Sequence, residues 1–69
     1  MDKQIAIGVQ EHALEAIKSL SEALYLCTDR CSSEEYQLIK RGVGLSIGRI
    51  ETELLGVIYK EFPELDDLP

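Results

Sequence analysis

Two cysteines and one histidine are the side chains of this sequence best suited to metal binding or redox chemistry. Cys27 and Cys31 are four residues apart and would share one face of a helix, whereas His12 precedes them by several helical turns. The three side chains cannot converge within one chain, so we expect reduced, buried thiols that pack as small hydrophobic groups. A metal or redox site built from cysteines across an oligomer axis and an internal disulfide are the alternatives. No metal and no cofactor is predicted.

Three basic residues form a second candidate site, for an anion or a nucleotide. Lys40, Arg41 and Arg49 are three of the seven basic side chains and lie among glycines that would leave helix backbone accessible. A nearby tyrosine could stack on a base; the candidates are Tyr25, Tyr36 and Tyr59. The simpler interpretation is that each arginine pairs with an acidic side chain, such as Glu11, Glu34 or Glu53.

No pattern of residues in the chain predicts catalysis. The carboxylates are typical of a solvated acidic surface, and a two-helix chain offers no pocket in which catalytic groups could converge. Gly42, Gly44 and Gly48 lack the following Lys-Ser/Thr pair of a phosphate-binding loop and lie in a helical pattern. We therefore expect a protein that is not an enzyme.

Length and charge narrow the range of folds and partners. A chain of 69 residues has room for one domain, and its formal net charge of −6 argues against nucleic acid or an anionic membrane as a partner. No apolar stretch approaches the ~20 residues of a membrane span, and a cytoplasmic protein is expected. A chain this short gains little net stability alone and needs disulfides, a metal or association. With only two cysteines, association is predicted.

Apolar residues at alternating spacings of four and three predict a first helix over residues 10–30. The repeating positions are Ala13, Ile17, Leu20, Leu24, Cys27 and Cys31. Residues 1–9 are ambiguous, since Ile5, Ile7 and Val9 alternate and Gly8 disfavours a helix. This arm is predicted as a short strand, an extended segment or a frayed helical turn behind Asp2.

A second helix is predicted over residues 33–61. Ser32 and Glu35 have the spacing of a capping box, and Pro63 ends the helix and leaves an acidic tail at residues 62–69. A connection this short joins two antiparallel helices into a hairpin. The stripe predicted to meet the first helix contains Tyr36, Ile39, Val43, Ile47, Ile50, Leu54, Val57 and Ile58.

The second helix also carries an apolar and small-residue face on its other side. Leu38, Leu45, Thr52 and Tyr59 recur every seventh residue, and Gly44, Gly48, Thr52 and Gly56 every fourth. Each interior glycine costs up to about 1 kcal/mol, which close helix packing would offset. We therefore expect a homo-oligomer interface here, with a break or kink at residues 42–48 and a ligand against the backbone as alternatives. The predicted interface residues are Leu38, Leu45, Gly48, Thr52, Gly56 and Tyr59.

Together these patterns predict an all-α antiparallel two-helix hairpin that assembles as a homodimeric four-helix bundle or a larger symmetric oligomer. The favoured function is a small acidic interaction protein, such as an adaptor, inhibitor or antitoxin-like module. Its partner would bind an exposed apolar patch around Leu26, Phe62 and Leu65. The alternatives are a binder of an anionic metabolite or nucleotide at subunit grooves and a cysteine metal or redox site.

Overall fold

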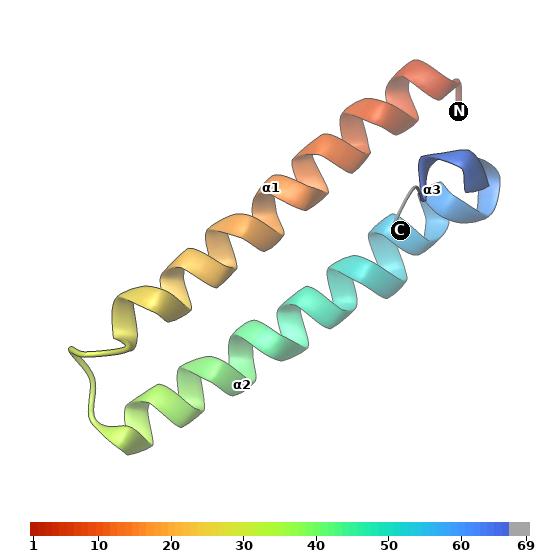
Figure 1. Cartoon of the computed structure of the whole chain (residues 1–69). Coiled ribbons are helices and arrows are strands. Elements are labelled where there is room, and N and C mark those ends of the chain that lie inside the picture. Colours follow the sequence, from red (N-terminus) through yellow and green to blue (C-terminus); the bar gives the residue numbers. More distant parts are fainter. Residues whose placement is uncertain (67–69) are drawn as a thin grey trace.

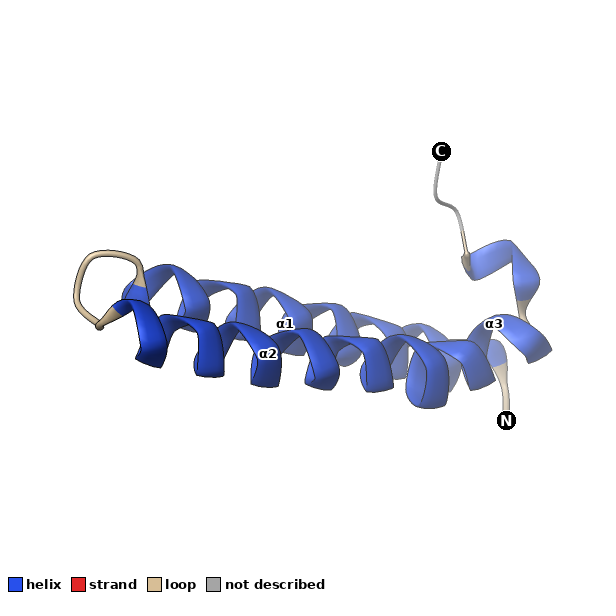
Figure 2. Cartoon of the chain, turned by 90° about the horizontal axis from the view of Figure 1, so that it is seen from below, coloured by secondary structure: helices blue, strands red, loops and turns tan. Residues whose placement is uncertain are grey.

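The computed structural model describes residues 1–66, and this part of the chain is helical, which confirms the predicted all-α class. The elements are α1 (Lys3–Cys27), α2 (Ser33–Arg49), a π-helical segment η1 (Ile50–Leu55), α3 (Gly56–Glu61) and a 3-10 turn η2 (Pro63–Leu65). In Figure 1, α1 and α2 lie side by side in opposite directions and α3 extends the line of α2. Figure 2 shows the helices as one layer, from which only the C-terminal turn rises. The predicted acidic tail falls partly outside the described residues.

The N-terminal arm is a regular part of α1. Of the three conformations predicted for residues 1–9, the helical turn behind Asp2 comes nearest to this, whereas the predicted helix boundary at residue 10 is wrong. Helix α1 begins at Lys3 because the side chain of Asp2 caps it, accepting a hydrogen bond from the amide of Ile5 at 2.9 Å. Ala6, seven residues before Ala13, is fully buried and extends the predicted seam towards the N-terminus. This packing offsets the low helix propensity of Gly8, which counted against a helix in the sequence.

Helix α1 ends at Cys27, before the predicted residue 30, and the capping box then starts α2. The Ser32 hydroxyl accepts a hydrogen bond from the Glu35 amide at 3.1 Å, and the Glu35 carboxylate accepts one from the Ser32 amide at 2.8 Å. These two bonds confirm the predicted capping box and satisfy amides that the first helical turn leaves free. The Ser32 backbone amide, and to a smaller extent the Ser32 hydroxyl, interact with the Glu35 carboxylate and hold its pKa below the ordinary value.

Helix α2 continues without interruption through Gly42, Gly44 and Gly48, so the break considered at residues 42–48 does not occur. The irregularity comes later, in η1. There the Thr52 hydroxyl donates to the Gly48 carbonyl oxygen at 2.9 Å, and the amide of Gly56 donates to the carbonyl of Glu51, five residues earlier. A threonine hydroxyl that occupies the carbonyl four residues back favours such a local widening of the helix.

The π-helical segment changes which residues face α1. One extra residue in a turn rotates all later positions by roughly 100°. Leu54 and Val57, which were predicted to face α1, are 41% and 53% exposed, so those two predictions are wrong. Leu55 takes their place and is buried with Ile58, at 4% and 1% exposure. Ile39, which belongs to the same predicted stripe but precedes η1, is 42% exposed, and the rotation does not explain its exposure.

The buried core is small and lies along the contact between the helices. Its buried hydrophobic residues are Ala6, Ala13, Val43, Leu55 and Ile58. The other seam positions of α1, from Ile17 to Cys27, are half-buried. Within residues 1–66, no helix combines the length and the apolar character that crossing a bilayer requires.

Candidate functional site

Helix α2 and the start of η1 carry an exposed face on the side away from α1. We name it the outer face of α2 and define it as Leu38, Arg41, Leu45, Gly48 and Thr52. Leu38 and Leu45 are 66% and 61% exposed. A methyl group added at Gly48 would meet no other atom within 4 Å. At 100° per residue, these positions lie opposite the ones that pack on α1. Within the chain this face is therefore uncovered.

Two of the residues predicted for this face lie elsewhere because η1 rotates them. Tyr59 is half-buried, and its hydroxyl accepts a hydrogen bond from the side chain of Gln10 at 3.0 Å. Gly56 is half-buried, and a methyl group there would lie 3.5 Å from the Glu51 carbonyl oxygen. The seven-residue and four-residue repeats in the sequence therefore describe one continuous face only as far as Thr52.

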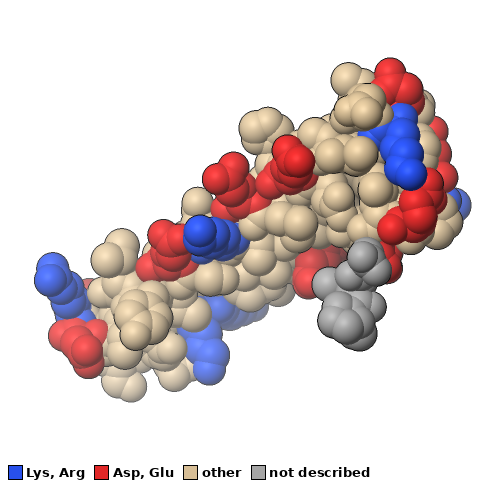
Figure 3. Space-filling view, turned by 45° about the horizontal axis from the view of Figure 1, so that its top comes forward, with Lys and Arg blue, Asp and Glu red and all other residues tan. Residues whose placement is uncertain are grey.

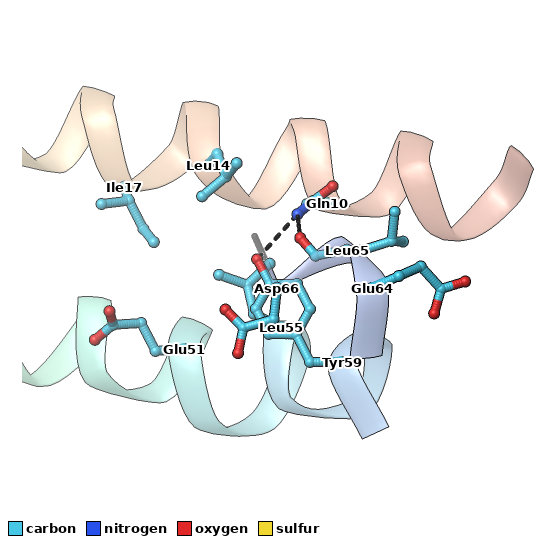
Figure 4. A pocket seen from close by; sticks show the side chains of 9 residues that line it. All are labelled: Gln10, Leu14, Ile17, Glu51, Leu55, Tyr59, Glu64, Leu65 and Asp66. Atoms are coloured by element: carbon cyan, nitrogen blue, oxygen red, sulfur yellow. Dashed lines mark hydrogen bonds between the residues drawn. The ribbon is translucent and has the colours of Figure 1, made fainter. Parts of the chain in front are cut away.

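A groove of about 760 Å³ lies between α1 and the C-terminal half of the chain (Figure 4). Gln10 closes one part of it, because its side-chain amide donates to the Tyr59 hydroxyl at 3.0 Å and to the Leu65 carbonyl oxygen at 2.8 Å. These bonds hold the η2 turn against α1. The residues that line the groove are Gln10, Leu14, Ile17, Glu51, Leu55, Tyr59, Glu64, Leu65 and Asp66.

The groove is acidic. Three of its lining residues, Glu51, Glu64 and Asp66, carry carboxylates, and none of the nine is basic. Lys3 lies 3.2 Å from the Glu64 carboxylate. A hydrogen bond from its own backbone amide, and then Lys3, hold the pKa of Glu64 below its ordinary value. Within residues 1–66 Glu51 and Asp66 make no ion pair, so the groove retains uncompensated negative charge.

The three basic residues of the predicted anion site do not line this groove. Arg49 forms an ion pair with Glu53, one helical turn later, as the simpler interpretation of the sequence expected. Lys40 and Arg41 are exposed. Figure 3 shows basic and acidic side chains interspersed on the face it presents.

The cysteines are free, and both are half-buried rather than buried as predicted. Hydrogen bonding to the Cys27 side chain, followed by burial, raises the pKa of Cys31 above its ordinary value of 9.0. A raised pKa keeps the thiol protonated and lowers its reactivity. His12 is exposed on α1, and within residues 1–66 no three histidine, cysteine or acidic side chains are grouped to hold a metal ion.

The predicted apolar patch around Leu26, Phe62 and Leu65 is not one surface. Leu26 is 71% exposed near the end of α1 at the turn, whereas Phe62 and Leu65 are half-buried at the end that holds both termini. Gln10 and Leu55 were not among the predicted site residues. No local pattern marks them, because both act through segments that are distant in the sequence.

Comparisons of the chain with protein-family models, with curated proteins and with solved structures find no match. The function is therefore argued from the two surfaces just described.

Proposed function

We propose that the protein is a non-catalytic interaction module that self-associates through the outer face of α2, as a homodimeric antiparallel four-helix bundle or a larger symmetric oligomer. The supporting observation is the large surface of the single chain. It exposes 5433 Å², whereas a compact monomer of 7.7 kDa exposes about 4,300 Å². Its radius of gyration is 14.5 Å, compared with about 11 Å for a compact domain of this length.

The residues of the outer face suit contact between helices. Leu38 and Leu45 supply exposed apolar area, and Gly44 and Gly48 have open space above them. Glycines on a helix surface let a second helix approach closely, so that backbone and side-chain atoms make contacts a larger residue would prevent. Such contacts would offset the loss of helix stability, roughly 1 kcal/mol, that each glycine causes inside a helix.

The order of charges along α2 and η1 supports an antiparallel arrangement. Arg41 lies in the first half of this continuous helix and Glu53 in the second. A two-fold axis near Leu45 and Gly48 would bring Arg41 of one copy towards Glu53 of the other. In a parallel arrangement Arg41 would face Arg41 of the other copy, and Glu53 would face Glu53, so that like charges repel. In the antiparallel assembly Glu53 would lie between Arg49 of its own chain, with which it already pairs, and Arg41 of the other copy. By contrast, an anionic ligand at the basic residues has less support, since Arg49 already has an acidic partner.

Substitutions on the outer face test the proposal. Gly48→Leu places a large side chain where the proposed contact between two helices has no room for one, and Leu45→Glu places a charge in the same contact. Both variants should dissociate or change oligomeric state, as measured by light scattering coupled to size exclusion at micromolar concentration. Leu26→Glu, at an equally exposed leucine outside this face, is the matched control and should leave assembly unchanged.

Two results would contradict self-association. One is a parent protein that elutes as a single 7.7 kDa species and melts independently of concentration. The other is a Gly48→Leu variant that keeps the assembly of the parent and melts at a higher temperature, since only improved helix propensity would then have been gained.

A further inference from the structure

The groove at the end with the termini has the length of a two-turn helix. On one wall Gln10, Leu14 and Ile17 follow one another at helical spacing along α1, and on the facing wall Glu51, Leu55 and Tyr59 do the same. At ~1.5 Å per residue each wall is about 10–12 Å long, which is two helical turns. A third helix laid between two antiparallel helices presents side chains at i, i+3 or i+4, and i+7 over this same length.

The chemistry of the groove selects the kind of helix. Leu14, Ile17, Leu55 and Leu65 give it an apolar interior, and Leu14 is still 48% exposed in the free chain. Glu51 and Asp66 add negative charge that no basic side chain of residues 1–66 neutralises through an ion pair. An occupant that covers the leucines should therefore carry lysine or arginine beside its apolar side chains.

The groove is formed before any partner binds. The side-chain amide of Gln10 donates hydrogen bonds to Tyr59 and Leu65, which are 49 and 55 residues away in the sequence. The N-terminal amine pairs with Glu61 at 3.1 Å, and Lys3 pairs with Glu64 at 3.2 Å, so the walls are joined at the end of the groove as well. A preformed site costs less conformational entropy to occupy than one that must order on binding.

We propose that this groove binds a two-turn helical segment of another protein, with leucine-like side chains facing inward and lysines or arginines at its edges. This surface differs from the outer face of α2, on which the proposed self-association rests. Either proposal can therefore fail without the other.

A designed peptide pair tests the proposal on the full chain. The probe is a helical peptide of about 15 residues with leucines at i, i+3, i+4 and i+7 and lysines flanking them. The control peptide keeps the leucines and replaces each lysine by glutamate. Titration by calorimetry should show binding of the lysine peptide, weakened by added salt, and no binding of the glutamate peptide.

Variants of the protein locate the binding to the groove. Glu51→Gln and Asp66→Asn should each weaken binding of the lysine peptide by about two- to fivefold, as expected for a partly exposed ion pair. Leu14→Ala should weaken it by about tenfold through lost apolar contact. The matched controls are Glu22→Gln and Leu26→Ala, on exposed positions of α1 outside the groove, which should leave the affinity unchanged.

Three outcomes would overturn the proposal. The first is that the lysine peptide does not bind, or that both peptides bind equally. The second is that Glu51→Gln, Asp66→Asn and Leu14→Ala leave its affinity at the parent value. The third is that the same variants change the oligomeric state of the protein without peptide, which would make the groove a contact between copies of this chain.

Discussion

The two ends of the helix pair differ in how far the chain completes its own packing. At the end with the termini, α1 is joined to the C-terminal region by the ion pairs of Met1 and Lys3 and by the two hydrogen bonds of Gln10. Four of the five buried hydrophobic residues lie on this side, from Ala6 and Ala13 to Leu55 and Ile58. Towards the turn only Val43 is buried, at 9% exposure, and Leu38 on the outer face of α2 is 66% exposed.

This difference indicates what each half requires. The half near the termini contains a third segment, η2, which folds back over α1 and encloses side chains on more than one side. The half near the turn has only two helices, which touch along one line and leave their outer sides to solvent. Two helices packed on each other can bury only one stripe of side chains on each helix. The stability of the half near the turn should therefore depend most on association.

The largest effect is expected from Ile58→Ala, which breaks the better-packed half. Ile58 is 1% exposed, and truncating a fully buried isoleucine costs about 2–5 kcal/mol of unfolding free energy. Val43→Ala, in the other half at 9% exposure, removes fewer atoms from a looser site and should cost less. Urea unfolding of both variants at one protein concentration measures the difference. An equal loss per carbon atom removed would mean that the two halves are packed alike.

A smaller effect is expected from Gln10→Ala, which removes the bonds that hold η2 to α1. The Leu65 carbonyl and Tyr59 hydroxyl lose their donor, at a cost of about 1–3 kcal/mol. Amide hydrogen exchange should rise at Leu65 and Asp66, while the amides of the turn at residues 28–31 keep their rates. Gln4→Ala, at an exposed position of the same helix, is the control. Unchanged exchange at Leu65 would show that η2 is held by other contacts.

The smallest effect concerns one acidic residue at each end. Hydrogen bonds lower the folded-state pKa of both Glu35 and Glu64 below the ordinary value of 4.5. Their stabilisation is therefore fully present above that value and is lost as the pH falls through the lowered folded-state values.

The two carboxylates can be separated by substitution, with the pKa of each read from NMR titration. Ser32→Ala should raise the pKa of Glu35 part-way, since the backbone hydrogen bond remains, and should leave Glu64 unchanged. Lys3→Ala should raise the pKa of Glu64 part-way, since its backbone hydrogen bond remains, and should leave Glu35 unchanged. A shift of both groups in either variant would mean that the two ends of the helix pair are coupled.

Features that depend on neighbouring residues could be predicted from the sequence. The apolar period of α1, the Ser32–Glu35 capping box and the end of the helix before Pro63 were all predicted, because each rests on residues within about four positions. The start of α1 was missed although Asp2 marked it. Gly8 lowers local helix propensity, and the burial of Ala6 that offsets it is a tertiary contact.

The tertiary structure alone decided the phase of the second helix and the groove. The sequence repeats placed Leu54, Val57, Gly56 and Tyr59 by a constant 100° per residue, and the π-helical segment at Ile50–Leu55 rotates them away from those directions. The groove follows from that rotation together with the return of η2 to Gln10, across 55 residues of sequence. A periodic pattern assumes the same rotation for every residue, and the widened turn at η1, where the Thr52 hydroxyl bonds to the Gly48 carbonyl, does not obey it. The return of η2 is a contact between segments that are distant in the sequence, so no local pattern encodes it.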